Sequence, residues 1–292
     1  MPEVSPRESH GETGRSPGSP KWSHGETGRS PGSPKWSHGE TGRSPGSPKD
    51  RFVTVYGRNQ VIEVLDDHSL VVDKVVLAHG ARGPQVGEIL GLAEDRGVPV
   101  QRVDAERVKK LAGNGRQDQG VFADVVAPRM RPLADAVDDP TLRRVVVLDG
   151  LTTPANVGMV IRTATAAGID GIVVPRRGVA SIDPMVVKAS AGVAFRAPIL
   201  KCGTAAEAAT MLRVAGFHLV GLSADAPQTI FDAPWPDHVA IVLGSESTGH
   251  SPDVADQMTS WASIPMAGGV ESLNVSAAAA VVCFELVRRS LG

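Results

Sequence analysis

Near-continuous apolar runs recur in the second half of the chain, separated by polar and Gly-containing stretches. They cover residues 145–148, 171–174, 217–222, 239–243 and 261–264. Strands buried on both faces have this composition, which is typical of a parallel sheet covered by helices. Helical patterns lie between the runs, at 156–168, 183–191 and 204–215, and another ends the chain. The pattern predicts a doubly wound α/β domain.

Shorter strands and helices alternate between residues 52 and 127. The segment VYGRNQVIEVL begins as a strand and passes into a helix, and residues 73–78, 98–103 and 120–126 have strand patterns. Residues 86–96 favour a helix that ends at Gly97, and Asp104 is placed to cap a helix through residue 111. The alternation predicts a small separate α/β domain with an aliphatic core.

Two segments lack such patterns. The sequence GETGRSPGSPKWSH repeats every 14 residues from Gly11, and its third copy is incomplete. Such a composition buries too little surface to offset chain entropy, so residues 1–50 are expected to be a disordered tail. The tail is either an RNA tether, through its Arg, Lys and Trp residues, or a dispensable repeat. Residues 128–140, rich in Pro and charge, are expected to link the small domain to a second domain at 141–292.

Composition narrows the class of protein. The net charge of −2 argues against a uniformly basic nucleic-acid binder, although it leaves room for a local basic patch. The two cysteines, Cys202 and Cys283, form no disulfide framework, so a reducing cytoplasm is expected. No apolar run has the length of a membrane span, and the N-terminus lacks the hydrophobic stretch of a secretory signal. The eight His are scattered, and no metal site is expected.

A polar cluster precedes the C-terminal helix. Glu271, Ser272 and Asn274 lie between a Gly-rich loop and four consecutive alanines at 277–280. Ser and Asn cap helices, and the alanines leave little bulk, so another backbone can approach closely. These features suit a pocket that contacts its ligand through backbone groups. The pattern G-x-G-x-x-G is absent from every strand-to-helix turn, which argues against a dinucleotide enzyme.

Three sequence motifs occur in a fixed order in the second domain. They are NVGMVIRTATAAG at 156–168, IVLGSESTG at 241–249, and IPMAGGVESLNVSAAAA from residue 264. Together they resemble the motifs of the SpoU (TrmH) family of RNA 2'-O-ribose methyltransferases, in the SPOUT superfamily. The segments VYGRNQVIEVL and RQDQGVFADV resemble the L30e-like domain fused in front of many members. The resemblance therefore covers residues 52–292.

The resemblance implies a fold, a cofactor and partners. The implied fold is α/β: a C-terminal SPOUT domain, with a parallel sheet and a deep trefoil knot, preceded by an L30e-like domain that helps to grip ribosomal RNA. Family members use S-adenosyl-L-methionine to methylate a ribose 2'-hydroxyl. They pair through the knotted domain, so a homodimer is expected.

The resemblance also implies catalytic residues. Arg162 matches the arginine regarded as catalytic in the family, and a permanently charged guanidinium suits the phosphate beside the target ribose. Asn156 either caps its helix or contacts substrate, and Glu246 orients Arg162 or Asn156. Ser272 and Asn274 match the polar residues that position substrate and cofactor. The alternative interpretations are a helix-surface arginine, a loop carboxylate and simple helix caps.

Cofactor binding is implied in the loops after the late strands. By resemblance it lies at Gly244, Ile264 and Leu273, with Met266, Gly268 and Gly269 nearby. The glycines make physical sense, because a ligand bound through backbone groups requires close approach of the chain.

The front domain carries candidate RNA contacts. Basic side chains are expected to meet phosphates, with ordinary solvated charge as the alternative, at Arg58, Arg82, Lys109, Lys110 and Arg116. The family has His where Asp118 stands, so no role is carried over to that position.

These features predict a cytoplasmic methyltransferase that acts on RNA, with 23S (large-subunit) ribosomal RNA as the favoured substrate. Ribose methylation of transfer RNA is the nearest alternative. An antibiotic-resistance ribosomal RNA methyltransferase and a catalytically silent RNA-binding relative also stay open. The intact Arg162, Glu246, Ser272 and Asn274 argue against the silent relative. Selection of the target nucleotide depends on the folded shape of the RNA.

Overall fold

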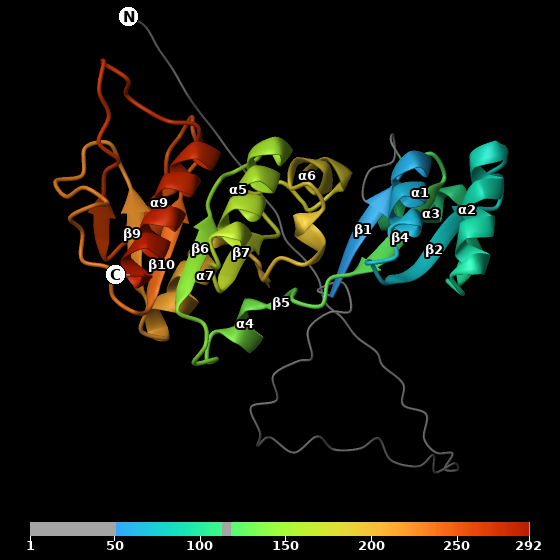
Figure 1. Cartoon of the computed structure of the whole chain (residues 1–292), viewed down its shortest axis with the longest axis horizontal. Coiled ribbons are helices and arrows are strands. Elements are labelled where there is room, and N and C mark those ends of the chain that lie inside the picture. Colours follow the sequence, from blue (N-terminus) through green and yellow to red (C-terminus); the bar gives the residue numbers. More distant parts are fainter. Residues whose placement is uncertain (1–50, 113–117, 292) are drawn as a thin grey trace, which may run out of the picture. The chain divides into compact units, whose positions relative to one another are not determined.

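The structure is a computed structural model that describes residues 51–112 and 118–291. Figure 1 labels its helices and strands. The expected disordered tail at residues 1–50, and Arg116 among the expected RNA contacts, lie outside the described residues.

The small domain forms a four-stranded sheet in the order β1-β4-β2-β3. The β1/β4 and β4/β2 pairs are antiparallel and the β2/β3 pair is parallel. Its elements, close to those expected, are β1 (Phe52–Tyr56), α1 (Arg58–Asp66), β2 (Val72–Ala78), α2 (Pro84–Asp95), β3 (Val100–Val103), α3 (Ala105–Ala112) and β4 (Val121–Val126). Gly97 follows α2 with a φ of +63° and donates its N–H to the carbonyl of Glu94, so the expected glycine helix end is confirmed.

The large domain contains a seven-stranded sheet in the order β11-β9-β10-β6-β7-β8-β5. Every neighbouring pair of its strands is parallel, as the apolar runs predict. The strands are β5 (Arg131–Pro132), β6 (Arg144–Leu148), β7 (Gly171–Pro175), β8 (Ile199–Cys202), β9 (His218–Leu222), β10 (Val239–Leu243) and β11 (Ser260–Ala262).

Helices cover both faces of this sheet, as Figure 1 shows. Val146 of β6 is buried in the same cluster as residues of α5 and α9, whereas Val145 and Val147 are buried on the other side with residues of α7. Successive side chains of a strand point to opposite faces, so β6 is apolar on both faces from Val145 to Leu148. The helices are α4 (Leu133–Ala136), α5 (Pro154–Ala166), α6 (Pro184–Ala189), α7 (Ala205–Val214), α8 (Pro252–Ala255) and α9 (Val275–Ser290), with a 3₁₀ turn at Val193–Phe195.

Some elements were not expected from the sequence. β8 lies in the sheet between β7 and β5, in a segment without a strand prediction. The expected linker at 128–140 contains both β5 and α4, and Leu133 and Ala136 of α4 are fully buried. The domain boundaries and the trefoil knot stay predictions.

Three adjacent strands end at the same edge of the sheet. β9, β10 and β6 are parallel neighbours that end at Leu222, Leu243 and Leu148. In open α/β sheets, ligands bind outside the carboxyl ends of the strands. This edge is where the motif residues gather.

Both cysteines are buried, Cys202 in β8 and Cys283 in α9. Burial raises the pKa of each thiol to about 12. Within the described part of the chain, no helix is long and apolar enough to cross a membrane.

Helices α5 and α6 approach each other closely at Gly158, and we base a first prediction on this contact. A Cβ added to Gly158 would lie 2.6 Å from both the Ala189 Cβ and the Val186 carbonyl oxygen, so the helices must separate to admit it. We expect Gly158→Ala to lower the free energy of unfolding by about 1–3 kcal/mol, measured by urea denaturation. The control is Gly91→Ala in α2, where a Cβ meets open space and the change should stabilise by up to about 1 kcal/mol. Equal effects of the two substitutions would contradict the packing argument.

Candidate functional site

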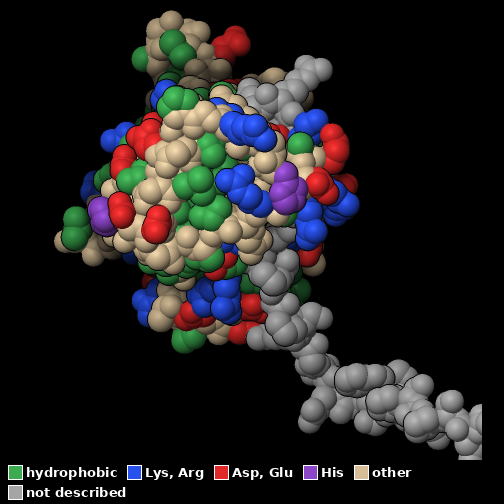
Figure 2. Space-filling view, turned by 90° about the vertical axis from the view of Figure 1, so that its right-hand side faces the viewer, with side chains coloured by type: hydrophobic (Ala, Val, Ile, Leu, Met, Phe, Trp, Pro, Cys, Tyr) green, Lys and Arg blue, Asp and Glu red, His purple; other side chains and the backbone are tan. Residues whose placement is uncertain are grey.

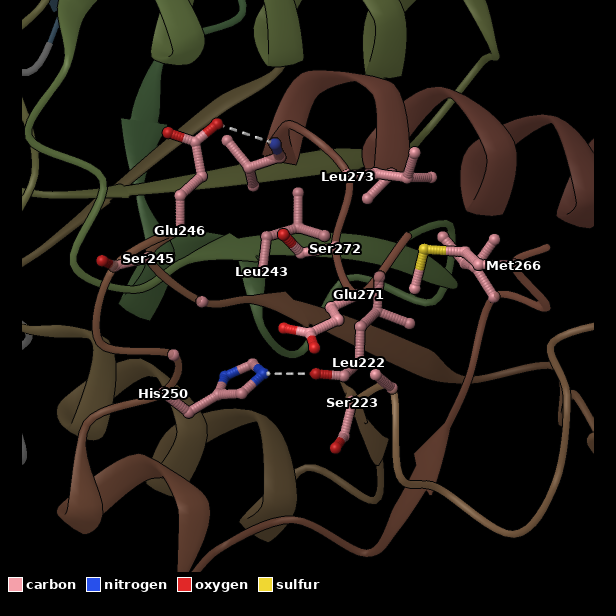
Figure 3. Close-up of a pocket in the computed structure, with 16 residues that line it drawn as sticks. Leu222, Ser223, Leu243, Ser245, Glu246, His250, Met266, Glu271, Ser272 and Leu273 are labelled. Carbon is pink, nitrogen blue, oxygen red and sulfur yellow. Dashed lines mark hydrogen bonds between the residues drawn. The ribbon is translucent and has the colours of Figure 1, made fainter. Parts of the chain in front are cut away.

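Three loops at this edge of the sheet surround a pocket. One follows β9 at Leu222, another follows β10 at Gly244, and the third leads into α9 at Val275. Figure 3 shows side chains of all three around the same cavity. The second and third loops carry the second and third sequence motifs.

The loop after β10 is folded tightly on itself. Ser245 and Gly249 exchange two backbone hydrogen bonds, each 2.9 Å long. A Cβ on Gly244 would lie 2.7 Å from the carbonyl carbon of Gly249, so only glycine fits at that point. The Ser245 hydroxyl accepts hydrogen bonds from the backbone N–H groups of Ser247 and Thr248, at 3.2 and 3.3 Å. These contacts fix the backbone around Glu246.

Glu246 joins the loop to two helices. Its carboxylate accepts hydrogen bonds from the Asn156 side-chain amide of α5, at 2.9 Å, and from the Val275 backbone N–H of α9, at 3.1 Å. The Asn274 side-chain amide also donates to it. Asn274 donates in addition to the Asn156 side-chain oxygen, at 3.1 Å. We call Asn156, Glu246 and Asn274 the polar triad; it unites all three motifs.

Asn156 and Asn274 have different roles at the starts of α5 and α9. Thr153 is the N-cap of α5, so the interpretation of Asn156 as that cap is wrong, and its side chain is buried in the triad. Asn274 is the N-cap of α9, and its oxygen accepts from the Ser276 N–H at 2.9 Å. Asn274 therefore both caps and belongs to the triad. Ser272 precedes the cap and lines the pocket.

Most of the predicted cofactor positions line the pocket. Gly244, Ile264, Met266 and Leu273 do so, together with Glu246. The two glycines at 268 and 269 do not; they bend the third loop, with φ values of +68° and +74°. These left-handed conformations favour glycine, which explains the Gly-Gly pair.

Arg162 is separate from the pocket. It is exposed on α5, and no hydrogen bond or ion pair joins it to another described residue. The structure therefore brings together Asn156, Glu246 and Asn274 but leaves Arg162 on the neighbouring helix surface.

Two residues that support the pocket were missed from the sequence. Asp149, buried after β6, accepts hydrogen bonds from the Ser251 N–H and hydroxyl at 2.7 and 3.1 Å, which anchors the end of the second loop. His250 contacts the Leu222 carbonyl through Nε2, at 3.2 Å, and packs edge-on against Trp261. The sequence offered one signal for Asp149, an acidic residue directly after an apolar strand. It offered no comparable signal for His250.

Two family models match the chain. Residues 143–284 match the SpoU rRNA Methylase family, and residues 54–131 match the domain described as RNA 2'-O ribose methyltransferase substrate binding. The chain belongs to the SpoU family. The expected enzyme class, an RNA 2'-O-methyltransferase, is confirmed, and S-adenosylmethionine is the cofactor that this family uses.

Similar proteins span nearly the same length. The 23S rRNA (guanosine-2'-O-)-methyltransferase RlmB of Xanthomonas campestris is 32% identical over 82% of this chain and 97% of its own. A protein of Staphylococcus haemolyticus assigned to the TrmH family of tRNA/rRNA methyltransferases is 33% identical, over 81% of this chain and 96% of its own. The solved structure of an AdoMet-bound rRNA methyltransferase from Sinorhizobium meliloti has a TM-score of 0.56 and 25% identity, covering 84% of this chain and 89% of its own.

His250 makes the stability of this SpoU-family protein depend on pH. Burial lowers the pKa of its imidazole below the usual 6.5, against the opposing effects of the Leu222 carbonyl and Asp149. The unfolded chain therefore binds more protons just below pH 6.5, and stability falls as the pH drops through 6.5 toward the folded-state pKa.

We expect the free-energy advantage of the wild type over His250→Gln to be largest above pH 7 and to shrink toward pH 5, as measured by urea denaturation at each pH. Parallel stability curves for the two proteins would contradict this assignment of the titrating group.

Proposed function

We propose that this protein methylates a ribose 2'-hydroxyl of 23S ribosomal RNA in the cytoplasm, with S-adenosylmethionine as methyl donor. The observation that carries the proposal is the polar triad, which holds α5, the second loop and α9 together beside a pocket at the carboxyl edge of the sheet. The RNA substrate-binding match in the front domain and the similarity to the RlmB methyltransferase support a ribosomal substrate.

The pocket residues suit this cofactor. The close backbone at Gly244 and the apolar side chains of Ile264, Met266 and Leu273 form a wall for an adenosyl group. Gly268 and Gly269 shape the loop that carries them. When bound, S-adenosylmethionine supplies a methyl group already activated by its sulfonium.

The protein side chains then have to place the RNA. Exposed Arg162 is proposed to bind the phosphate beside the target ribose and to favour loss of the 2'-hydroxyl proton. Asn156 and Asn274, both oriented by Glu246, are proposed to position the ribose, together with Ser272 at the pocket rim. Alignment of reactants is the main requirement of a direct methyl displacement.

The front domain is proposed to hold the RNA through scattered basic residues. Arg82 and Lys110 are exposed, Lys109 pairs with Glu106, and Arg58 is half-buried. In Figure 2, which faces α1 to α3, Lys and Arg side chains alternate with acidic ones instead of forming one basic surface. Asp118 is not among these proposed RNA contacts. Its buried carboxylate accepts a hydrogen bond from the Gly120 N–H at 2.7 Å, which is a contact within the domain.

A homodimer is also proposed, through the exposed stripes of α5 and α9. Ala155, Met159 and Ala166 are exposed along α5, and Phe284, 49% exposed, lies on α9 in line with Ala277. The two helices pack together, so these apolar residues border Arg162. A second copy that covers them would bring its surface close to that arginine.

The decisive test is methyl transfer from labelled S-adenosylmethionine to separate pools of 23S rRNA, 16S rRNA and transfer RNA. We expect label in 23S rRNA at a single position that resists alkaline cleavage. Arg162→Ala should reduce the rate by about 10²–10³-fold, because a charged contact made in the transition state is lost. Arg213→Ala, an exposed arginine of α7, is the matched control and should leave the rate unchanged.

The same assay separates the competing functions. Label confined to transfer RNA would favour the substrate that the Staphylococcus haemolyticus relative also suggests. Cofactor binding without label in any pool would contradict the methyltransferase proposal and favour a silent RNA-binding protein.

The dimer is tested by sedimentation at micromolar concentration. We expect Phe284→Glu to convert a dimer into a monomer, because a charge would be buried at the apolar stripe. Val214→Glu places the same charge at an exposed valine of α7, on the opposite face of the sheet, and should leave the dimer intact. A monomeric wild type would refute the proposed interface.

A further inference from the structure

The charges that line the pocket have one sign. Glu246 and Glu271 contribute carboxylates, and no Lys or Arg is among the described residues that line it. An adjoining cavity shares Glu271, and its other charged residue is Asp225. A ligand therefore meets negative potential on this side, which favours a positively charged group.

The two pocket carboxylates have different surroundings. Glu246 is occupied by the amide donors of the triad and the Val275 N–H. Glu271, in contrast, is exposed and accepts no hydrogen bond from any described residue. Figure 3 shows its carboxylate pointing into the pocket, on the side of Leu222 and Ser223. Its charge is available to a ligand.

The start of α9 does not supply a competing anion site. The Val275 N–H is bonded to Glu246, and the Ser276 N–H is bonded to the Asn274 oxygen. Free N–H groups at a helix N-terminus are what attract an anion, and here these donors are already used. Glu271 is therefore left as the unpaired charge of the pocket among the described residues.

We propose that Glu271 is the counter-charge of the bound cofactor and gives the pocket its preference for a cationic ligand. This inference rests on the proposed function, in which the pocket holds S-adenosylmethionine. That molecule carries a sulfonium and an α-ammonium group. S-adenosylhomocysteine keeps only the ammonium, and 5'-methylthioadenosine has neither cationic group but keeps the adenosyl part.

The test is calorimetric titration of these three compounds into the full chain and into Glu271→Gln. The substitution removes the charge and keeps the size of the side chain. We expect the Kd of S-adenosylmethionine to rise about three- to tenfold, as for a partly solvated charge pair, and the Kd of 5'-methylthioadenosine to stay within about twofold. Asp253→Asn, an exposed acidic residue outside the pocket, is the control and should change neither value.

S-adenosylhomocysteine identifies the charge that Glu271 faces. Unchanged binding of S-adenosylhomocysteine assigns the sulfonium, whereas a loss equal to that of S-adenosylmethionine assigns the ammonium; both support the proposal. If Glu271→Gln weakened the binding of all three compounds equally, Glu271 would have a structural role. If it changed the Kd of none of them, Glu271 would take no part in recognition. Either result overturns the proposal. A wild type that binds none of the three would instead contradict the proposed function itself.

Discussion

The candidate site depends on the hydrogen bonds that the Glu246 carboxylate accepts. It accepts an amide from α5, an amide from the residue before α9, and the first N–H of α9 itself. Those donors come from segments 90 and 28 residues away in sequence. A charged acceptor with several amide donors forms strong hydrogen bonds, so one loop residue fixes the relative positions of two helices.

The position of the Glu246 carboxylate is set by the two ends of the loop that carries it. Gly244 permits the loop to turn back on itself at the end of β10, and Asp149 anchors the other end of the loop to β6. The sheet supplies a rigid edge, while the loops supply backbone groups and polar side chains. Arg162 remains outside this hydrogen-bonded group, on the surface of α5. The architecture therefore separates a hydrogen-bonded pocket from an arginine that faces outward.

Sequence patterns predicted most of the fold, because strands buried on both faces have continuous apolar runs, as in residues 145–148 of β6 and in β10. They failed for β8, because Lys201 interrupts its short apolar run. The motifs located the polar triad, although Thr153, not Asn156, is the N-cap of α5. Asp149 and His250 could not be found in the same way, since their contacts join residues 102 and 28 positions apart, and such pairings exist only after folding.

The dual contact of Asn274 limits which amino acid can occupy its position. Helix α9 requires only an oxygen at its cap, and Ser, Thr or Asp would provide one equally well. The triad requires two further donors at this position, because the Asn274 amide donates both to Glu246 and to the Asn156 oxygen. Among these four side chains only Asn has two N–H donors together with an acceptor, since a hydroxyl has one donor and a carboxylate has none. Spontaneous deamidation of Asn274 to Asp would keep the oxygen that caps α9 but would place a second carboxylate beside Glu246, so chemical ageing at this one amide would disrupt the triad while leaving the helix cap in place.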